Sequence, residues 1–181
     1  MILITGGARS GKSALAERLA ARHGDNVLYI ATSVVTDDEM AQRVRRHRES
    51  RPAQWRTWEG YRDLGAVITQ QAAADRAVIV ECVTTLIANL LFEQAGDTPA
   101  ERMDFPAIEA VIQRQIDALI DACLRSAAPI YLVTNELGMG IVPENRLARH
   151  FRDIAGRVNQ RLAAAAESVY LVVSGIEVKI K

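Results

Sequence analysis

A glycine-rich segment near the N-terminus constrains the fold of this chain more than any other feature. It follows the apolar run Met1–Thr5 directly and leads into a helical stretch, Ser13–Arg22. Its glycines let the backbone curl so that successive N–H groups point at one bound oxyanion, and the following helix N-terminus favours negative charge. The segment comprises Gly6, Gly7, Ala8, Arg9, Ser10, Gly11, Lys12 and Ser13. This order of residues is typical of a phosphate-binding loop and predicts binding of a nucleoside triphosphate.

Two residues of the loop have predicted chemical roles. Lys12, the only lysine before Lys179, is expected to reach the β and γ phosphates, and the Ser13 hydroxyl is expected to bind Mg²⁺. Such a metal needs an acidic partner, and Glu81 offers one where the apolar run Val78–Val80 ends. Aspartate is the usual residue there, so Glu81 is a departure. The alternative is a glutamate that merely leaves the sheet.

Short apolar runs alternate with helical stretches along the chain, as in a doubly wound α/β domain. The expected strands are Met1–Thr5, Val27–Thr32, Val78–Cys82, Ile130–Thr134 and Val169–Ser174, followed after a turn at Gly175 by Ile176–Ile180. The expected helices are Ser13–Arg22, Asp37–Arg48, Arg62–Ala74, Phe105–Arg125 and Glu144–Glu167, the last with Pro143 in its first turn. Gln94–Pro106 is expected to be a long loop. These elements predict a P-loop NTPase-like, mostly parallel sheet flanked by helices, with an antiparallel C-terminal edge strand.

Composition limits the class of protein. With 181 residues and 49% apolar residues, we expect one P-loop nucleotide-binding catalytic domain over residues 1–181. The formal net charge is zero, which gives no support to binding of nucleic acid or a membrane surface. No apolar stretch reaches spanning length, so no membrane span is expected. Cys82 and Cys123 lie in apolar surroundings without metal-ligand spacing, and we interpret them as reduced core residues of a cytoplasmic protein.

An arginine-rich segment surrounds one histidine. Thr36 and Glu39 form a capping box at the start of the predicted helix, and the arginines that follow are Arg43, Arg45, Arg46, Arg48 and Arg51. Arginine forks suit phosphate oxygens. Neighbouring guanidinium charges favour a neutral imidazole at His47, and a neutral ring nitrogen is a nucleophile. From the residues alone, a surface histidine on a solvated basic helix remains the alternative.

These motifs together resemble one family along essentially the whole chain. It is the bifunctional adenosylcobinamide kinase / adenosylcobinamide-phosphate guanylyltransferase family of cobalamin biosynthesis. The resemblance is carried by the phosphate-binding loop, Tyr29–Thr32, Asp38–Met40, the segment around His47, Trp55–Thr57, Glu81–Cys82, Thr134–Pro143 and Phe151–Gln160. The stretch from Thr134 to Pro143 and the phosphate-binding loop are together highly specific.

The resemblance implies two reactions and a site for each. ATP or GTP phosphorylates the aminopropanol hydroxyl of adenosylcobinamide, and GTP then donates GMP to adenosylcobinamide phosphate through a covalent intermediate on His47. It implies a homo-oligomer and Mg²⁺ as cofactor with the nucleotides. The implied nucleotide contacts beyond the loop are Ala31, Thr32, Ser33, Arg48, Glu49, Ser50, Arg51, Glu59 and Glu81.

Two other functions are compatible with the phosphate-binding loop. A monofunctional small-metabolite kinase would use Lys12, Ser13 and Glu81 but would give His47 no role. A nucleotide-gated binding module would switch conformation without transferring a group.

Overall fold

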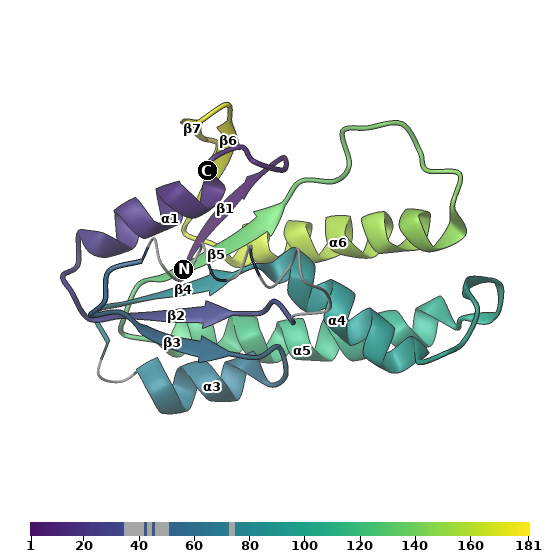
Figure 1. The fold of residues 1–181 in the computed structure, drawn as a ribbon, viewed down its shortest axis with the longest axis horizontal. Coiled ribbons are helices and arrows are strands. Elements are labelled where there is room, and N and C mark those ends of the chain that lie inside the picture. The colour runs from purple at the N-terminus through teal and green to yellow at the C-terminus, as the bar shows by residue number, and fades with distance from the viewer. Residues whose placement is uncertain (35–41, 43–44, 46–50, 73–74) are drawn as a thin grey trace.

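A seven-stranded sheet runs through the molecule and is parallel except at one edge. The computed structural model describes residues 1–34, 42, 45, 51–72 and 75–181 (Figure 1). The strand order is β3-β2-β4-β5-β1-β6-β7, and β7 is antiparallel to β6. The strands are β1 (Ile2–Gly6), β2 (Val27–Ala31), β3 (Arg56–Glu59), β4 (Ala77–Glu81), β5 (Ile130–Asn135), β6 (Ser168–Val173) and β7 (Ile176–Lys179). The predicted fold class and its antiparallel C-terminal edge strand are therefore confirmed.

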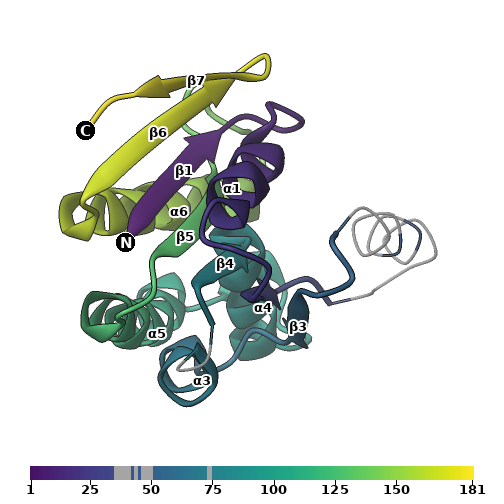
Figure 2. The same ribbon diagram turned by 90° about the vertical axis from the view of Figure 1, so that its left-hand side faces the viewer.

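Helices cover both faces of this sheet. One face is covered by α1 (Lys12–Ala21), and the other by a layer that comprises α3 (Leu64–Gln71), α4 (Val83–Ala95), α5 (Phe105–Arg125) and α6 (Arg146–Ala165). Figure 2 shows α1 on one side of the twisted strands, with α5 and α6 on the other. Among the described residues, no helix is both long and apolar enough to cross a membrane.

The apolar runs of the sequence form strands that are buried on both faces. In β4, Val78 and Val80 pack with α3–α6, while Ala77 and Ile79 pack with α1. Burial on both faces demands apolar residues at every position, which explains why these strands show continuous runs and no alternation.

Two elements were missed from the sequence. The edge strand β3 is mostly exposed, and only Trp58 of its residues packs on the core, so no apolar run marks it. Most of the helix α4 lies in the segment left unassigned before the expected loop at 94–106, and its last two residues lie within that loop. It is apolar over a broad face, because it packs on the sheet beside α5 and α6, and it therefore lacks a clear helical stripe.

The expectation for Pro143 was wrong. Helix α6 begins at Arg146, and Asn145 caps it by accepting a hydrogen bond from the Ala148 N–H at 2.9 Å. The polar side chain of Asn145 satisfies one of the orphan donors of the first turn, so the helix begins after the proline and not at it. Ile154, Val158 and Leu162 lie on one face of this helix and are buried in the core.

Segment 94–106 is more ordered than the expected loop. Helix α4 extends to Ala95, and a short 3₁₀ helix, η2 (Ala100–Arg102), precedes α5. The Arg146 side chain on α6 donates to the Ala100 carbonyl at 2.8 Å, which ties this connection to the start of α6.

Candidate nucleotide and metal site

The phosphate-binding loop connects β1 to α1 and packs against the β6–β7 turn. Gly175 N–H donates to the Ser10 carbonyl at 2.8 Å. A Cβ on Gly6 would lie 2.3 Å from the Val172 carbonyl oxygen, closer than any real contact. Gly11, with φ of 100°, caps α1 in the left-handed region, which L side chains rarely adopt. Glycine is therefore required at positions 6 and 11, by packing at the first and by backbone conformation at the second.

Lys12 is held against this loop. Its side chain is 7% exposed, and its ammonium donates to the Gly7 carbonyl at 2.6 Å. A charged group so nearly buried is expected only where it has partners. The contact fixes the cation at the loop that is expected to receive the phosphates.

Ser13 and Glu81 meet in front of the loop. The Ser13 hydroxyl donates to Glu81 Oε1 at 2.9 Å, although β5 lies between the strand of the loop and the strand that Glu81 ends. The pair forms because α1 crosses over β5 and packs on β4 as well. The sequence therefore predicted a pair of residues that the fold does bring together.

The second oxygen of Glu81 is orphaned. Glu81 Oε2 is buried and has no hydrogen-bond partner among the described residues. Burial raises the pKa of this carboxyl to about 7, against the opposing effects of the Ser13 hydroxyl and the Lys12 ammonium. A buried, unsatisfied carboxylate oxygen is costly unless a donor or a cation pairs with it. Its surroundings therefore fit a bound cation.

The donor set suits Mg²⁺ better than a metal held entirely by the protein. No cluster of three or more His, Cys, Asp or Glu side chains with metal-binding geometry occurs in the described part of the chain. Mg²⁺ is usually bound through one or two carboxylates together with substrate phosphates and water. The Ser13–Glu81 pair beside a phosphate-binding loop matches that pattern.

Tyr29 and Arg51 form a second cluster beside this pair. Tyr29 lies in β2, next to β4, and the Arg51 guanidinium carbon is 3.4 Å from the centroid of its ring. Glu17 lies one helical turn after Ser13, and burial raises its pKa while the Arg51 charge lowers it. Burial and the nearby Glu81 charge raise the pKa of Tyr29. Arg51 is thus the positive member of a partly buried group next to the metal-binding candidates.

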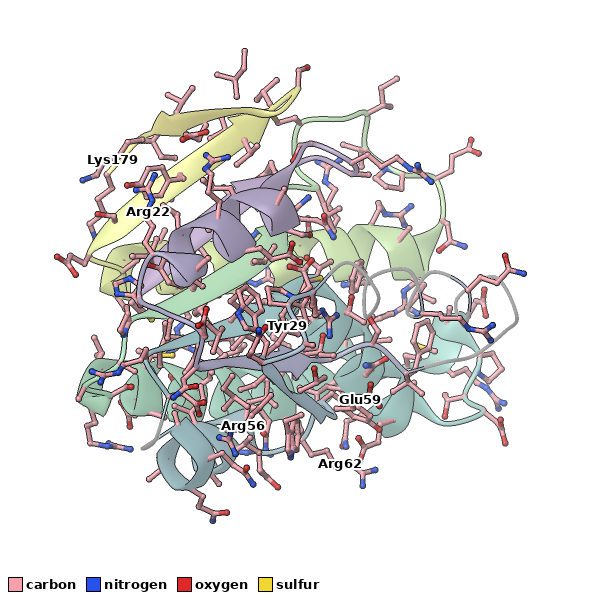
Figure 3. The ribbon with its side chains drawn as sticks, turned by 60° about the vertical axis from the view of Figure 1, so that its left-hand side comes forward. Arg22, Tyr29, Arg56, Glu59, Arg62 and Lys179 are labelled. Carbon is pink, nitrogen blue, oxygen red and sulfur yellow. The ribbon has the colours of Figure 1, made fainter. Side chains whose placement is uncertain are left out.

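Sequence reasoning assigned no role to Glu17 or Tyr29. The helical spacing from Ser13 to Glu17 could have indicated the former, because residues four apart share a face. Nothing in the sequence marks Tyr29 beyond its place in the stretch Tyr29–Thr32. Figure 3 labels Tyr29, which lies on β2 next to the edge strand β3, and Glu59 by the end of β3.

The residues expected at the ends of β2 and β3 lie at the carboxyl ends of the parallel strands, as Glu81 does. Ala31 is in register with Glu59 on one side and with Glu81 on the other. Thr32 is fully buried, and its hydroxyl donates to the Cys82 carbonyl and accepts from the Cys82 N–H, both at 2.8 Å. Its side chain therefore joins β2 to the end of β4, while Ala31 and Glu59 remain candidates for contact with a nucleotide.

Four predicted site residues cannot be placed. His47, Arg48, Glu49 and Ser50 lie outside the described residues, as do both residues of the capping box and most of the predicted helix Asp37–Arg48. Of the nucleotide contacts expected there, only Arg51 is described.

A polar network that sequence reasoning missed holds the end of β5. The Thr134 hydroxyl donates to the Asn159 side-chain oxygen at 2.8 Å and lies 3.2 Å from the Thr84 hydroxyl. The Asn159 side-chain amide donates to the Asn135 carbonyl at 3.1 Å. The signal in the sequence was a polar residue, Thr134, ending an apolar run. These bonds fix β5 between the strand of the phosphate-binding loop and the strand of Glu81.

A strand, phosphate-binding loop and helix, with a serine–glutamate pair at the carboxyl ends of parallel strands, define a P-loop nucleotide-binding protein. Solved structures agree on the fold. The RadB recombinase superimposes with a TM-score of 0.50 at 13% identity, covering 94% of this chain and 72% of that one. An ATPase from the type III secretion system of pathogenic bacteria superimposes with a TM-score of 0.55 at 12% identity, covering 98% of this chain and 56% of that one.

Sequence comparison gives the family. Residues 2–180 match the family described as cobinamide kinase / cobinamide phosphate guanyltransferase, and the chain belongs to this family. It is 61% identical over 183 residues to the bifunctional adenosylcobalamin biosynthesis protein CobU of Salmonella typhimurium, covering 100% of this chain and 99% of that protein. It is 58% identical to CobU of Escherichia coli with the same coverage. It is 41% identical to the protein CobP of Pseudomonas aeruginosa, covering 99% of this chain and 96% of that one. The resemblance seen in the sequence is confirmed.

Proposed function

We propose that this chain carries out two successive reactions on one corrinoid. ATP or GTP phosphorylates the aminopropanol hydroxyl of adenosylcobinamide, and GTP then donates GMP to adenosylcobinamide phosphate. The products of the second reaction are adenosyl-GDP-cobinamide and pyrophosphate. Membership of a family described by these two activities supports both reactions. The structural observation that carries the proposal is the Ser13–Glu81 contact at 2.9 Å, beside Lys12 and the phosphate-binding loop.

In the kinase reaction the protein positions two substrates and stabilises charge. The substrate hydroxyl oxygen forms a bond to the γ-phosphorus, the bond from that phosphorus to the bridging oxygen breaks, and the hydroxyl proton is released. The nucleoside diphosphate departs with the bond electrons. Lys12 and the N–H groups of the loop stabilise the negative charge on the phosphates, and this stabilisation is the main contribution that a protein makes to phosphoryl transfer.

Ser13 and Glu81 would hold the Mg²⁺ that accompanies the nucleotide. Their support is the orphaned, buried Oε2 of Glu81 next to a hydroxyl group. When bound, the ion would neutralise charge on the phosphate oxygens.

In the guanylyl transfer His47 would act as the nucleophile. A neutral imidazole nitrogen bonds to the α-phosphorus of GTP and pyrophosphate leaves. An oxygen of adenosylcobinamide phosphate then bonds to the same phosphorus and releases the histidine. Arg48 and Arg51 would bind phosphate oxygens, and the Glu59 carboxylate could accept from guanine N1–H and N2–H₂. Support for Arg51 comes from its position on Tyr29, beside Glu17 and Glu81.

We also propose that the chain works as a homo-oligomer in the cytoplasm. The edge strand β7 exposes Ile176 and Val178, and Ile180 just beyond its end is exposed as well. Exposed apolar edges of this kind are commonly covered in assemblies. Sedimentation at micromolar concentration should give a mass above that of one chain, and a monomer would contradict this part of the proposal.

Two radioactive labels test the pair of reactions. With adenosylcobinamide, label from γ-labelled GTP should appear in adenosylcobinamide phosphate, and label from α-labelled GTP should appear in adenosyl-GDP-cobinamide. Supplying adenosylcobinamide phosphate directly should allow the α label to transfer without the first reaction. Transfer of the γ label without any transfer of the α label would instead support a monofunctional kinase.

A further inference from the structure

The connection from β5 to α6 exposes apolar side chains. In Figure 1 it is the green arch beyond the carboxyl end of β5. Met139 is 80% exposed, Ile141 96% and Val142 62%. An apolar group of this kind on a protein surface often marks a binding site, whereas scattered single residues do not.

This connection is held in place by polar contacts on its inner side. The Arg152 guanidinium donates to the carbonyls of Gly140 at 3.3 Å and Ile141 at 3.1 Å. Arg149 donates to the carbonyls of Pro143, at 3.1 Å, and Glu144. Because two arginines of α6 bind its backbone carbonyls, the chain presents its apolar side chains outward from a fixed backbone.

The first residue of the same connection, Glu136, lies next to the phosphate-binding loop. The Glu136 N–H donates to the Gly6 carbonyl at 2.9 Å, and Gly6 is the first residue of that loop. At about 3.3 Å per extended residue, Met139 lies within ~10 Å of Glu136 and Ile141 within ~17 Å. A substrate whose hydroxyl reaches a phosphate in the loop would therefore have its body within reach of this surface.

We propose that Met139, Ile141 and Val142 bind the corrin macrocycle of the substrate, which deepens the proposed function and rests on it. Of the substrates in the two reactions, the nucleotides are charged and suit the phosphate-binding loop and arginines. The corrinoid is a broad macrocycle with methyl groups and amide-bearing arms at its edge, and it offers the large apolar surface that these side chains need. The flexible Met139 can adapt to an irregular surface of this kind. The aminopropanol arm then extends from the bound macrocycle towards the loop.

Substitution of these residues tests the proposal. Ile141→Ser should raise the KM for adenosylcobinamide in the kinase reaction about tenfold, as expected for losing one buried aliphatic side chain. Met139→Ser should also raise the KM for adenosylcobinamide, and the double variant should have a higher KM than either single variant. The affinity for GTP should not change. Leu124→Ser is the matched control, because Leu124 is an exposed apolar residue at a comparable 59%. It lies at the carboxyl end of α5, which leads into the amino end of β5, whereas the phosphate-binding loop lies at the carboxyl ends of the strands.

Equilibrium dialysis of adenosylcobinamide, followed by its visible absorbance, makes the test independent of turnover. The parent and Leu124→Ser should bind it equally, and the Ile141 and Met139 variants should bind it about tenfold more weakly. Sedimentation should show the same mass for all five proteins, the double variant included.

Three outcomes would overturn the proposal. Unchanged corrinoid affinity in the double variant would show that the patch does not contact the macrocycle. A lower mass in the Ile141 and Met139 variants would show that the patch contacts a second copy of the chain. A parent protein that binds no corrinoid would refute this site and the proposed function together. A parent that binds corrinoid through these residues without phosphorylating it would refute the proposed function alone.

Discussion

The Ser13 hydroxyl donates to the Glu81 carboxylate at 2.9 Å across a separation of 68 positions in the chain. The contact depends on the order of the strands, because β5 lies between β1 and β4 and α1 must cross it. It leaves the other carboxylate oxygen of Glu81 buried without a partner among the described residues. One serine and one glutamate thus form a polar site at the end of a phosphate-binding loop.

Lys12→Ala should abolish most of the kinase activity. The ammonium at the Gly7 carbonyl is the cation held at the loop, and removing one such charge-stabilising donor typically lowers turnover by about 10²–10³-fold. Initial rates of phosphate transfer to adenosylcobinamide check this, with Lys179→Ala as the control, since Lys179 ends β7. A near-normal rate in Lys12→Ala would show that the loop does not bind the transferred phosphate.

Glu81→Gln should weaken the dependence of the reaction on Mg²⁺. The amide keeps the size of the side chain but removes the charge that we expect to bind the ion. A titration of rate against Mg²⁺ concentration should shift to higher concentration, and the maximal rate should fall. Glu167→Gln, at the turn between α6 and β6, serves as the control. Identical titrations for Glu81→Gln and the parent would place the metal elsewhere.

The same substitution should change how stability depends on pH in the metal-free protein. The pKa of Glu81 is about 7 in the folded state, against 4.5 for an ordinary glutamate. Because the folded state holds the proton more tightly, the contribution of Glu81 to stability is present below pH 4.5 and is lost as pH rises to 7. Glu81→Gln should therefore gain stability relative to the parent across this window, by a few kcal/mol, on the order of 1.4 per unit of pKa shift.

Urea titrations at pH 5 and pH 8 without Mg²⁺ measure this difference. The free energy of unfolding of Glu81→Gln relative to the parent should be higher at pH 8 than at pH 5. An equal difference at both pH values would show that Glu81 is not buried as a carboxylate in the folded protein.

The Tyr29 ring should stabilise the Arg51 guanidinium, which stacks on it, and so support GTP binding. A guanidinium over an aromatic face is stabilised by about 0.5–2 kcal/mol, so Tyr29→Leu should raise the KM for GTP by roughly 2–30-fold. Tyr29→Phe keeps the ring and should remain close to the parent. If Tyr29→Phe lost as much GTP affinity as Tyr29→Leu, then the hydroxyl group and not the stacking would be the important feature.

Asn159→Ala should destabilise the fold without acting on the nucleotide directly. It would remove the acceptor of the Thr134 hydroxyl and the donor to the Asn135 carbonyl, and unsatisfied buried groups cost about 1–3 kcal/mol. Chemical denaturation should show that loss, whereas Gln160→Ala, at an exposed position of the same helix, should stay close to the parent. A neutral Asn159→Ala would mean that the network does not hold β5.

The sequence predicts the buried part of the fold well. Strands such as β4 and β5 are buried on both faces, so burial requires an apolar run that is visible in the chain. The phosphate-binding loop is equally visible, because its backbone demands glycine at positions 6 and 11. The Ser13–Glu81 pair follows from these elements, since Glu81 ends β4 and Ser13 lies in the first turn of α1, both at the carboxyl ends of the parallel strands.

Other features depend on tertiary contacts that leave little local trace. Three of the four residues of the edge strand β3 are polar because solvent covers most of it, and α4 lacks a stripe because it is buried over a broad face. The Arg51–Tyr29 stack joins residues from a strand and a distant segment, and no spacing indicates it. The exposed residues Met139 and Ile141 become informative only once the start of their connection, Glu136, is known to lie beside Gly6.

Incubation with GTP labelled at the α-phosphate tests whether His47 acts as the covalent nucleophile of the guanylyl transfer. The parent should acquire label and release pyrophosphate, and the adduct should be labile to acid and stable to base, as a histidine phosphoramidate is. His47→Asn should lose both the adduct and the guanylyl transfer. It should keep the kinase activity, because direct transfer to a substrate hydroxyl needs no protein nucleophile. Retained guanylyl transfer in His47→Asn, or an acid-stable adduct in the parent, would contradict the covalent mechanism.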